Sequence, residues 1–257
     1  MTPVIDLTGK RGLVVGIAND HSIAAGCARA FRQCGAQLAA TYVNDKAKPY
    51  VEQVADGLGI EWLAPCDVRI PGQLEALFGR IAAEWGRLDF LLHSIAFAPR
   101  EDLHGRVVDC SAEGFALAMD VSCHSFLRMA RLAEPLMSAG GCLLCITFYG
   151  SERVVEHYNL MGPVKAALES ATRYVAAELG AKRIRAHAIS PGPIATRAAS
   201  WIDRFDEMLE RAAAQVPEHE LVRIEDVGAL AAFLASDAAR HVTGTVVPVD
   251  SGQHLLA

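Results

Sequence analysis

The sequence predicts an α/β fold, in which a single domain spanning residues 1–257 forms a Rossmann-type doubly wound parallel sheet of about seven strands flanked by helices. Short β-branched or aliphatic runs alternate with longer helical patterns along the chain, an order typical of strand–helix–strand units. Such units need right-handed crossovers, which produce a parallel sheet covered on both faces. A length of 257 residues, of which 52% are hydrophobic, suits one large core. The ligand site of such a sheet lies at the carboxyl ends of its strands.

The apolar runs and helical patterns place each element in turn. Strands are expected at residues 13–16, 37–43, 60–64, 88–93, 142–147, 184–189 and 246–249. Helices are expected at residues 22–35, 46–57, 72–85, 111–137, 158–180, 199–214 and 225–236. The first helix shows the signals most clearly, because Ser22 is a favourable N-cap and Gly35 a favourable end.

Charge and hydropathy exclude several classes of protein. The 24 basic residues are outnumbered by 30 acidic ones, which gives a net charge of −6 and argues against a nucleic-acid partner. No segment approaches about 18 uninterrupted apolar residues, so no membrane span is expected. The apolar stretch 12–18 is too short for a signal peptide. We therefore expect a cytoplasmic protein.

Cysteine and histidine content argue against disulfides and metals. Seven cysteines are an odd number and fit a reducing compartment. Cys142 and Cys145 have C-x-x-C spacing, but residues three apart in a strand point to opposite faces, so we interpret both as small core residues. The histidines are scattered without the spacing of a ligand pair, and no metal site is predicted.

The turn after the first strand has the properties of a phosphate-binding loop, although the usual G-x-G-x-x-G motif is absent. Gly16 permits a tight turn and a close backbone approach, and Gly26 permits close helix–strand packing. Ser22 and Ile23 are expected to offer free N–H groups at the positive end of a helix. A plain turn is the alternative. The position between the first strand and the first helix favours a cofactor site.

The next two strand ends indicate which dinucleotide would bind. A 2′-phosphate usually meets an arginine or lysine after the second strand, but the chain has Val43 and Asn44 there, with Lys46 and Lys48 following. NADH is therefore expected rather than NADPH. After the third strand, Asp67 could accept a hydrogen bond from an adenine amino group or could cap the next helix.

Tyr158 and Lys165 are the candidate chemical centre. They are seven residues apart, so in a helix both would point from one face. A phenol has a pKa near 10, and a nearby lysine stabilises charge that develops on it and can hold ribose hydroxyls. A half-buried core aromatic is the alternative reading of Tyr158.

Two further loops would complete the pocket. After the sixth strand, Ile194 and Thr196 are expected near the carboxamide and the pyrophosphate of the cofactor. After the fourth strand, residues 93–99, which include Ser94, Ile95 and Ala98, would lie between ribose and substrate.

These motifs together resemble a known family. They comprise Gly16, Ser22, Ile23, Gly26, Thr41, Tyr42, Asn44, Asp45, Cys66, Asp67, Val68, His93, Ser94, Ile95, Phe97, Pro99, Tyr158, Met161, Gly162, Lys165, Gly192, Pro193, Ile194 and Thr196. The set resembles the bacterial enoyl-acyl-carrier-protein reductases, NADH-dependent and divergent members of the short-chain dehydrogenase/reductase superfamily, nearly from end to end. The spacing Tyr-x6-Lys is its most discriminating feature. Other members use Tyr-x3-Lys, which would need a lysine where this chain has Gly162.

The resemblance implies a reaction of fatty-acid biosynthesis. A hydride would pass from NADH to C3 of a trans-2-enoyl thioester, while Tyr158 stabilises the enolate and Lys165 holds the nicotinamide ribose. The implied cofactor contacts are Gly16, Ser22, Ile23, Val43, Asp67, Val68, Ser94, Ile95, Lys165, Ile194 and Thr196. The implied substrate contacts are Ala98, Phe148 and Tyr158.

The chain departs from the family pattern at several positions. Where the family has a second tyrosine, the chain has Phe148, and the adjacent Tyr149 would have to turn inward to supply a catalytic hydroxyl. Ala96 stands where glycine is common, and Ser251 interrupts the usual closing Asp-Gly-Gly. A serine that polarises ketones in other superfamily members is replaced by Cys145, which argues against a carbonyl reductase.

The resemblance also implies partners. The substrate would be an enoyl thioester on acyl carrier protein or coenzyme A, and the enzyme would be a homotetramer assembled through the helices at 111–137 and 158–180. Acyl carriers are acidic, so a basic rim is expected, although a solvated helix face explains the same residues equally well. The candidates are Lys182, Arg183, Arg185, Arg197, Arg204 and Arg211.

Two other functions remain open from the sequence. A 3-ketoacyl or carbonyl reductase of the same superfamily is the first, and a non-catalytic NAD(H)-binding protein is the second. Cys145 and Gly162 count against the first, whereas Phe148 and Ala96 leave the second open.

Overall fold

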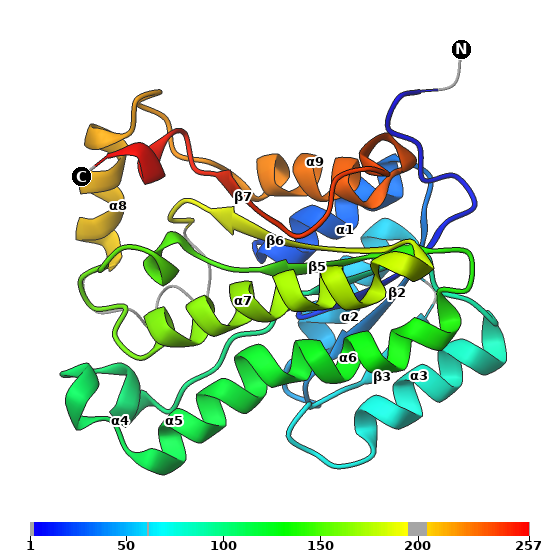
Figure 1. Cartoon of the computed structure of the whole chain (residues 1–257), viewed down its shortest axis with the longest axis horizontal. Helices are drawn as coiled ribbons and strands as arrows, with labels where there is room; N and C mark the ends of the chain where they lie inside the picture. The colour runs from blue at the N-terminus through cyan, green and yellow to red at the C-terminus, as the bar shows by residue number, and fades with distance from the viewer. Residues whose placement is uncertain (1–2, 61, 195–204, 257) are drawn as a thin grey trace.

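The computed structural model describes residues 3–60, 62–194 and 205–256. A seven-stranded parallel sheet forms its centre, with strand order β3-β2-β1-β4-β5-β6-β7 (Figure 1). The strands are β1 (Arg11–Val15), β2 (Gln37–Tyr42), β3 (Trp62–Pro65), β4 (Phe90–His93), β5 (Gly141–Ile146), β6 (Ile184–Pro191) and β7 (Thr245–Val249). The predicted Rossmann-type sheet is confirmed. Its order reverses between β1 and β4, where such sheets form a ligand crevice.

Helices cover both faces of the sheet (Figure 1). They are α1 (Ile23–Gln33), α2 (Lys48–Leu58), α3 (Gln73–Glu84), α4 (Arg100–Leu103), α5 (Ala112–Met119), α6 (Ser125–Ala133), α7 (Met161–Leu179), α8 (Phe205–Gln215) and α9 (Ile224–Ala235). One core cluster packs α3, α6 and α7 against the sheet, and a second packs α1, α2 and α9 against the opposite face. Cys145 lies in the first cluster and Cys142 in the second, which confirms that their side chains point to opposite faces.

The long helix predicted at residues 111–137 is interrupted. Between α5 and α6 the backbone forms a π-helical segment at Asp120–His124, and after α6 it ends in a 3₁₀ turn at Glu134–Leu136. A π-helical segment inserts an extra residue into the helix, and such segments are frequent at functional sites. Apolar periodicity continues through it, so the sequence pattern did not reveal the interruption.

Helix α7 begins later than predicted. The expectation that Tyr158 opens this helix is wrong, because the helix starts at Met161 and Tyr158 lies in the preceding turn. His157 and Asn159, on either side of Tyr158, have φ values of 64° and 44°, which a right-handed helix cannot contain. Tyr158 and Lys165 are therefore not two turns apart on one helix face.

The chain closes with a tight turn after β7. The Asp250 carboxylate accepts hydrogen bonds from the backbone N–H groups of Gly252 at 3.1 Å and His254 at 2.8 Å. Ser251 has a φ of 52°, in the left-handed region. A serine there is strained relative to glycine, because its Cβ crowds the backbone.

We expect the Ser251→Gly substitution to raise the free energy of unfolding by about 0.5–1 kcal/mol, because the relief of left-handed strain exceeds the extra entropy of glycine in the unfolded chain. Urea denaturation measures it. The matched control is Gly252→Ala, whose new Cβ would lie against Pro217 and which should destabilise the protein. Equal stability of Ser251→Gly and the unsubstituted protein would contradict the strain.

Candidate functional site

A cavity of about 720 Å³ opens at the carboxyl ends of β1 to β4. The structure places eight of the sequence-predicted cofactor residues on its wall. They are Gly16, Ile23, Val43, Asp67, Val68, Ser94, Ile95 and Lys165. The strands bring together segments that lie far apart in the sequence, because parallel strands present their carboxyl ends at one edge.

Gly16 occupies a position that has no room for a side chain, as the sequence predicted. Its φ is 113°, and a Cβ at this position would overlap the carbonyl group of Ser94 in the loop after β4. The Ser94 N–H donates to the Val15 carbonyl at 2.9 Å, which holds the two strand ends in contact. The close approach of these loops forms the floor of the cavity and leaves no room for a side chain at Gly16.

The beginning of α1 differs in one respect from the prediction. The Ser22 hydroxyl accepts from the Ala25 N–H at 3.3 Å and caps the helix as expected. The Ser22 N–H is not free, however, because it donates to the Asn19 carbonyl at 3.2 Å in the preceding turn. Ile23 is the first residue of the helix and lines the cavity. The first helical N–H groups, at the positive end of the dipole, are therefore the donors for an anion.

Asp67 does not take the capping role that was considered for it, because the N-cap of α3 is Gly72. Its carboxylate instead accepts from Arg69 Nη2 at 2.6 Å and from Arg69 Nε at 2.9 Å, and this lowers the pKa of Asp67. The Arg69 guanidinium also lies 5.3 Å from the ring centre of Phe97. All three residues line the cavity, so Asp67 remains a candidate for the predicted contact with an adenine amino group.

Lys165 is a buried cation on the cavity wall. Its side chain extends from α7 toward the end of β5, where Nζ donates to the Ile146 carbonyl at 2.8 Å, and the residue is 4% exposed. Burial lowers the pKa of Lys165 to about 8. An ammonium has three donors. Those not used by Ile146 remain for a ligand in the cavity.

Tyr158 lies in an apolar cluster beside this cavity. The cluster also contains Ala98 and Phe148, so the structure brings together the three predicted substrate contacts. None of them lines the cavity itself, but Ala98 directly follows two lining residues in the loop after β4. Burial, with the negative charge of Glu169, raises the pKa of Tyr158. Its hydroxyl has no hydrogen-bond partner within the described part of the chain, so it remains a neutral donor.

Tyr149 forms a hydrogen bond with the C-terminal segment and not with Tyr158. The two tyrosine rings both contact the ring of Phe148, at centroid distances of 4.6 Å for Tyr149 and 4.8 Å for Tyr158. The Tyr149 hydroxyl accepts from Gln253 Nε2 at 3.3 Å, in the C-terminal segment. This arrangement gives no support to the predicted catalytic role of Tyr149, because its hydroxyl is occupied away from the cavity.

The π-helical segment and the first residue of α6 supply contacts that were not predicted from the sequence. Ser122 holds the backbone of Phe97 from both sides, accepting from its N–H at 2.9 Å and donating to its carbonyl at 3.0 Å. Ser125 accepts from His93 Nε2 at 2.7 Å and donates to the Val121 carbonyl at 2.7 Å. Burial lowers the pKa of His93 to about 3, so this histidine is neutral. No motif marks these serines.

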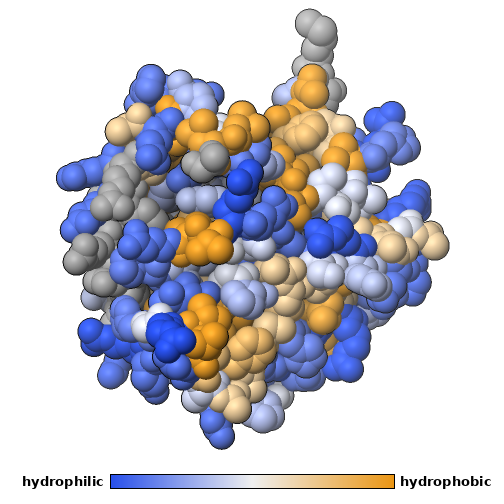
Figure 2. Space-filling model, turned by 60° about the vertical axis from the view of Figure 1, so that its left-hand side comes forward, coloured by the Kyte–Doolittle hydropathy of each residue, from blue (hydrophilic) through white to orange (hydrophobic). Residues whose placement is uncertain are grey.

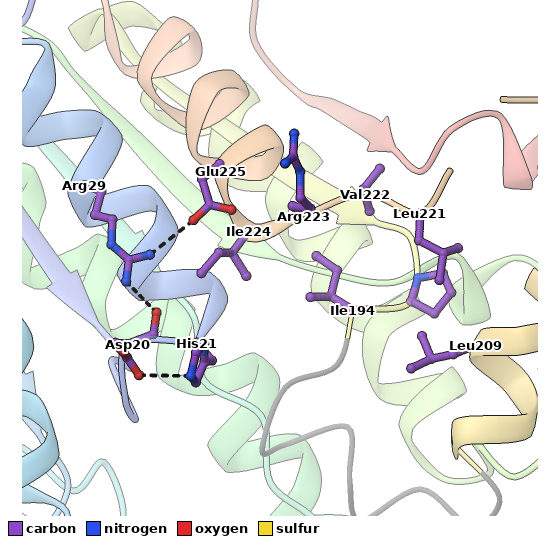
Figure 3. Close-up of a pocket in the computed structure, with 11 residues that line it drawn as sticks. Asp20, His21, Arg29, Ile194, Leu209, Leu221, Val222, Arg223, Ile224 and Glu225 are labelled. Atoms are coloured by element: carbon purple, nitrogen blue, oxygen red, sulfur yellow. Dashed lines mark hydrogen bonds and ion pairs between the residues drawn. The ribbon is translucent and has the colours of Figure 1, made fainter. Parts of the chain in front are cut away.

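A smaller pocket of about 540 Å³ lies beyond the start of α1 (Figure 3). It is lined by Ile194, which was predicted for the cofactor site but does not line the larger cavity. Arg29 crosses its edge, donating to Glu225 at 3.3 Å and to the Asp20 carbonyl at 2.7 Å. Thr196, the other cofactor residue predicted in this loop, lies outside the described residues.

The basic rim predicted for partner docking is wrong for three of its members. Lys182, Arg183 and Arg185 lie at the beginning of β6, at the opposite edge of the sheet from the cavity. Lys182 pairs with Glu134 at 2.6 Å, and Arg185 donates to the Leu234 carbonyl at 2.6 Å. These residues precede or begin the strand, whereas the ligand crevice of a parallel sheet lies at the carboxyl ends of its strands. Two other members, 197 and 204, lie outside the described residues.

The sequence and fold were compared with known proteins. A family model described as enoyl-(acyl carrier protein) reductase matches residues 16–254. The chain belongs to this family. The resemblance drawn from the motifs is thereby confirmed. Within the described ranges, no helix combines the length and apolar character needed to cross a bilayer.

Individual relatives are similar to the chain along nearly its whole length. The chain is 44% identical to an enoyl-[acyl-carrier-protein] reductase [NADH] 1 of Rhizobium meliloti over 248 residues, covering 96% of this chain and 91% of that protein. A crystal structure of the Anaplasma phagocytophilum enoyl-acyl-carrier-protein reductase with NAD superposes with a TM-score of 0.94 at 41% identity, covering 100% of this chain and 97% of that one. The Bacillus cereus reductase with NADP⁺ and indole naphthyridinone gives a TM-score of 0.95 at 42% identity, covering 98% of each chain.

We expect Ser125→Ala to lower the free energy of unfolding by about 1–3 kcal/mol, because buried His93 Nε2 would lose the hydrogen-bond partner that it has in the described structure. Urea denaturation at neutral pH is the measurement. Ser138→Ala, at an exposed position, is the control and should change stability by less than about 0.5 kcal/mol. A Ser125→Ala protein as stable as this control would refute the structural role of the His93–Ser125 bond.

Proposed function

We propose that this protein is an NADH-dependent enoyl-thioester reductase, in which Tyr158 stabilises the enolate of a trans-2-enoyl substrate and Lys165 holds the cofactor ribose. The observation that carries the proposal is a neutral Tyr158 hydroxyl with no partner among the described residues, in an apolar cluster beside a cavity that contains a buried ammonium. An apolar cluster suits an acyl chain, and a neutral phenol suits an oxyanion that forms only during the reaction.

The residues of the cavity fit a dinucleotide. Because Gly16 has no Cβ, the turn after β1 can lie against the loop after β4, which a Cβ would overlap. The helix that begins at Ile23 directs its positive end to the same cavity. Asp67 is the carboxylate of the cavity wall and is neutralised by Arg69, whereas Lys165 adds a positive charge. The relatives are named NADH enzymes, which supports the same cofactor here. When bound, NADH supplies the hydride that the reduction requires.

The chain's own groups account for binding of the cofactor ribose and for stabilisation of the enolate. The Lys165 ammonium can donate to ribose hydroxyls with the donors that Ile146 leaves free. Tyr158 donates a hydrogen bond to the thioester oxygen as negative charge develops there, and its raised pKa keeps the proton on the phenol until then. The aromatic ring of Phe148 packs against Tyr158 and fixes its orientation.

The structure gives no support to a ketone reductase. Cys145 occupies the sequence position at which other superfamily members have a ketone-polarising serine. Its side chain is fully buried and contacts the Thr172 hydroxyl at 3.3 Å, on the side of the sheet covered by α7. Burial also raises the pKa of Cys145 to about 12. It is therefore a core residue and a poor donor to a substrate.

Assembly and carrier are further parts of the proposal. Phe115, Leu127 and Tyr174, on α5, α6 and α7, are exposed apolar side chains and support a homotetramer formed through these helices. The face in Figure 2 also shows apolar patches between hydrophilic residues. The names of the relatives favour acyl carrier protein over coenzyme A as the carrier of the thioester.

NADH oxidation with a trans-2-enoyl thioester, compared with the matching 3-ketoacyl thioester, tests the function. We expect turnover of the enoyl substrate alone. Tyr158→Phe should lower kcat by about 10²–10³-fold with NADH affinity unchanged, because the lost donor acts only in the transition state. Lys165→Ala should weaken NADH binding as well as turnover. Turnover of the ketoacyl substrate would refute the enoyl assignment, and NADH binding without any turnover would favour a non-catalytic protein.

The pKa of Lys165 predicts a pH limit for cofactor binding. Below about pH 8 the ammonium is charged and can donate to ribose, whereas above it the group loses its proton. The dissociation constant of NADH should therefore rise above pH 8, by up to about tenfold per pH unit. Fluorescence titrations from pH 6.5 to 9.5 measure this rise. Lys165→Met should remove it, and a pH-independent affinity in the unsubstituted protein would contradict the assignment.

A further inference from the structure

We propose that Glu169 is a positioning residue for Lys165: its buried carboxylate fastens the end of β5, which holds the ammonium, and supplies the counter-charge that keeps the ammonium protonated. The inference rests on the proposed function for its link to catalysis. The geometry itself does not depend on that function.

Glu169 and Lys165 contact consecutive residues of the sheet. They are four residues apart on α7 and so share one face of the helix. Both are buried, with 3% and 4% of their surface exposed. The Thr147 hydroxyl donates to Glu169 Oε1 at 2.6 Å, and Lys165 Nζ donates to the Ile146 carbonyl at 2.8 Å. One helical turn of α7 thus holds the strand end at two successive positions.

The residue held by Glu169 lies where the strand leaves the sheet. Strand β5 ends at Ile146, and the Thr147 N–H donates to the Ile189 carbonyl at 2.8 Å. The next residue, Phe148, packs against Tyr158. Release of Thr147 would therefore move the carbonyl acceptor of Lys165 on one side and the aromatic neighbour of Tyr158 on the other.

The groups around Lys165 leave Glu169 as the source of negative charge. Cys145 on β5 and Cys123 in the π-helical segment would favour the charged lysine only as thiolates, but burial raises the pKa of both thiols, so they are neutral near pH 8. His93 on β4 is neutral, with its pKa lowered to about 3, and Tyr158 is neutral because its pKa is raised. Glu169 is the carboxylate among these described groups.

An isosteric substitution separates the charge from the hydrogen bond. In Glu169→Gln the amide oxygen can still accept from the Thr147 hydroxyl, but the negative charge is lost. The chain has five lysines, Lys10, Lys46, Lys48, Lys165 and Lys182, so ¹³C NMR of the ε-carbons resolves the buried one. We expect the Lys165 titration midpoint, about pH 8 in the unsubstituted protein, to fall by about one pH unit. The pH above which NADH affinity declines should fall by the same amount.

Matched substitutions of Thr147 test the hydrogen bond between Thr147 and Glu169, which is called the tether below. Thr147→Val keeps the charge of Glu169 and removes the hydrogen bond. It should leave the Lys165 midpoint within about 0.3 pH units of its original value, yet raise the dissociation constant of NADH at pH 7 several-fold. Thr147→Ser retains the hydroxyl and should restore the affinity. Thermal unfolding of each protein verifies that the fold is retained, and Thr147→Val and Thr147→Ser remain informative if Glu169→Gln does not fold.

An unchanged Lys165 midpoint in Glu169→Gln would overturn the counter-charge role, and unchanged NADH affinity in Thr147→Val would overturn the tether. The NMR titration needs neither substrate nor turnover. A protein that titrates as expected but reduces no enoyl thioester would therefore retain the positioning role of Glu169 and lose the proposed function.

Discussion

The hydrogen bond from Lys165 Nζ to the Ile146 carbonyl joins helix α7 to the end of β5, and most of the site is arranged around it. Removing an ammonium from water is costly unless partners replace the lost hydration. One carbonyl satisfies one of its three donors. The cavity must supply acceptors for the others, either water or the hydroxyls of a ligand. Burial of the Lys165 ammonium thus costs free energy on folding, and it also strengthens the hydrogen bonds that the ammonium forms with a ligand.

Support for this centre comes from an irregular helix on the same side of the sheet. The π-helical segment at Asp120–His124 directs Ser122 to the loop after β4 and leaves Val121 on the cavity wall. Arg128, on α6, donates to the Val68 carbonyl at 2.9 Å and fixes the loop after β3. Polar contacts with this helix therefore position the loops that form the cavity, in addition to the sheet.

The sheet and most of the cavity wall could be predicted because they depend on periodicity and on the ends of strands. Gly16 and Val43 end predicted strands and Ser94 follows one, so the topology alone brings them to one edge. The beginning of α7 could not be predicted in this way. Left-handed backbone at His157 and Asn159 is set by local packing, and apolar spacing carries no sign of it. The seven-residue interval between Tyr158 and Lys165 correctly indicated the family, but the two residues do not share a helix face.

Individual polar contacts, whether between near or distant residues, were also beyond the sequence. The ion pair of Asp67 with Arg69 connects near neighbours, yet neither of the roles considered for Asp67 included it. The His93–Ser125 bond spans 32 positions and follows from no motif. Such pairs become visible only when the fold has set the two groups at bonding distance, since serine, histidine and arginine have many possible partners.

The irregular turn between α5 and α6 has a consequence for how this chain tolerates insertions and deletions. Each residue of a regular α-helix advances the side chains by about 100°, so an extra residue changes the angular phase of everything after it. The wide turn absorbs one such residue, and both halves still bury their apolar sides. Loss of one residue within Asp120–His124 would therefore give a regular helix with Phe126 and Met129 still facing the core. Loss of one residue within α5 or α6, where no wide turn compensates, would rotate the apolar side of one half away from the sheet.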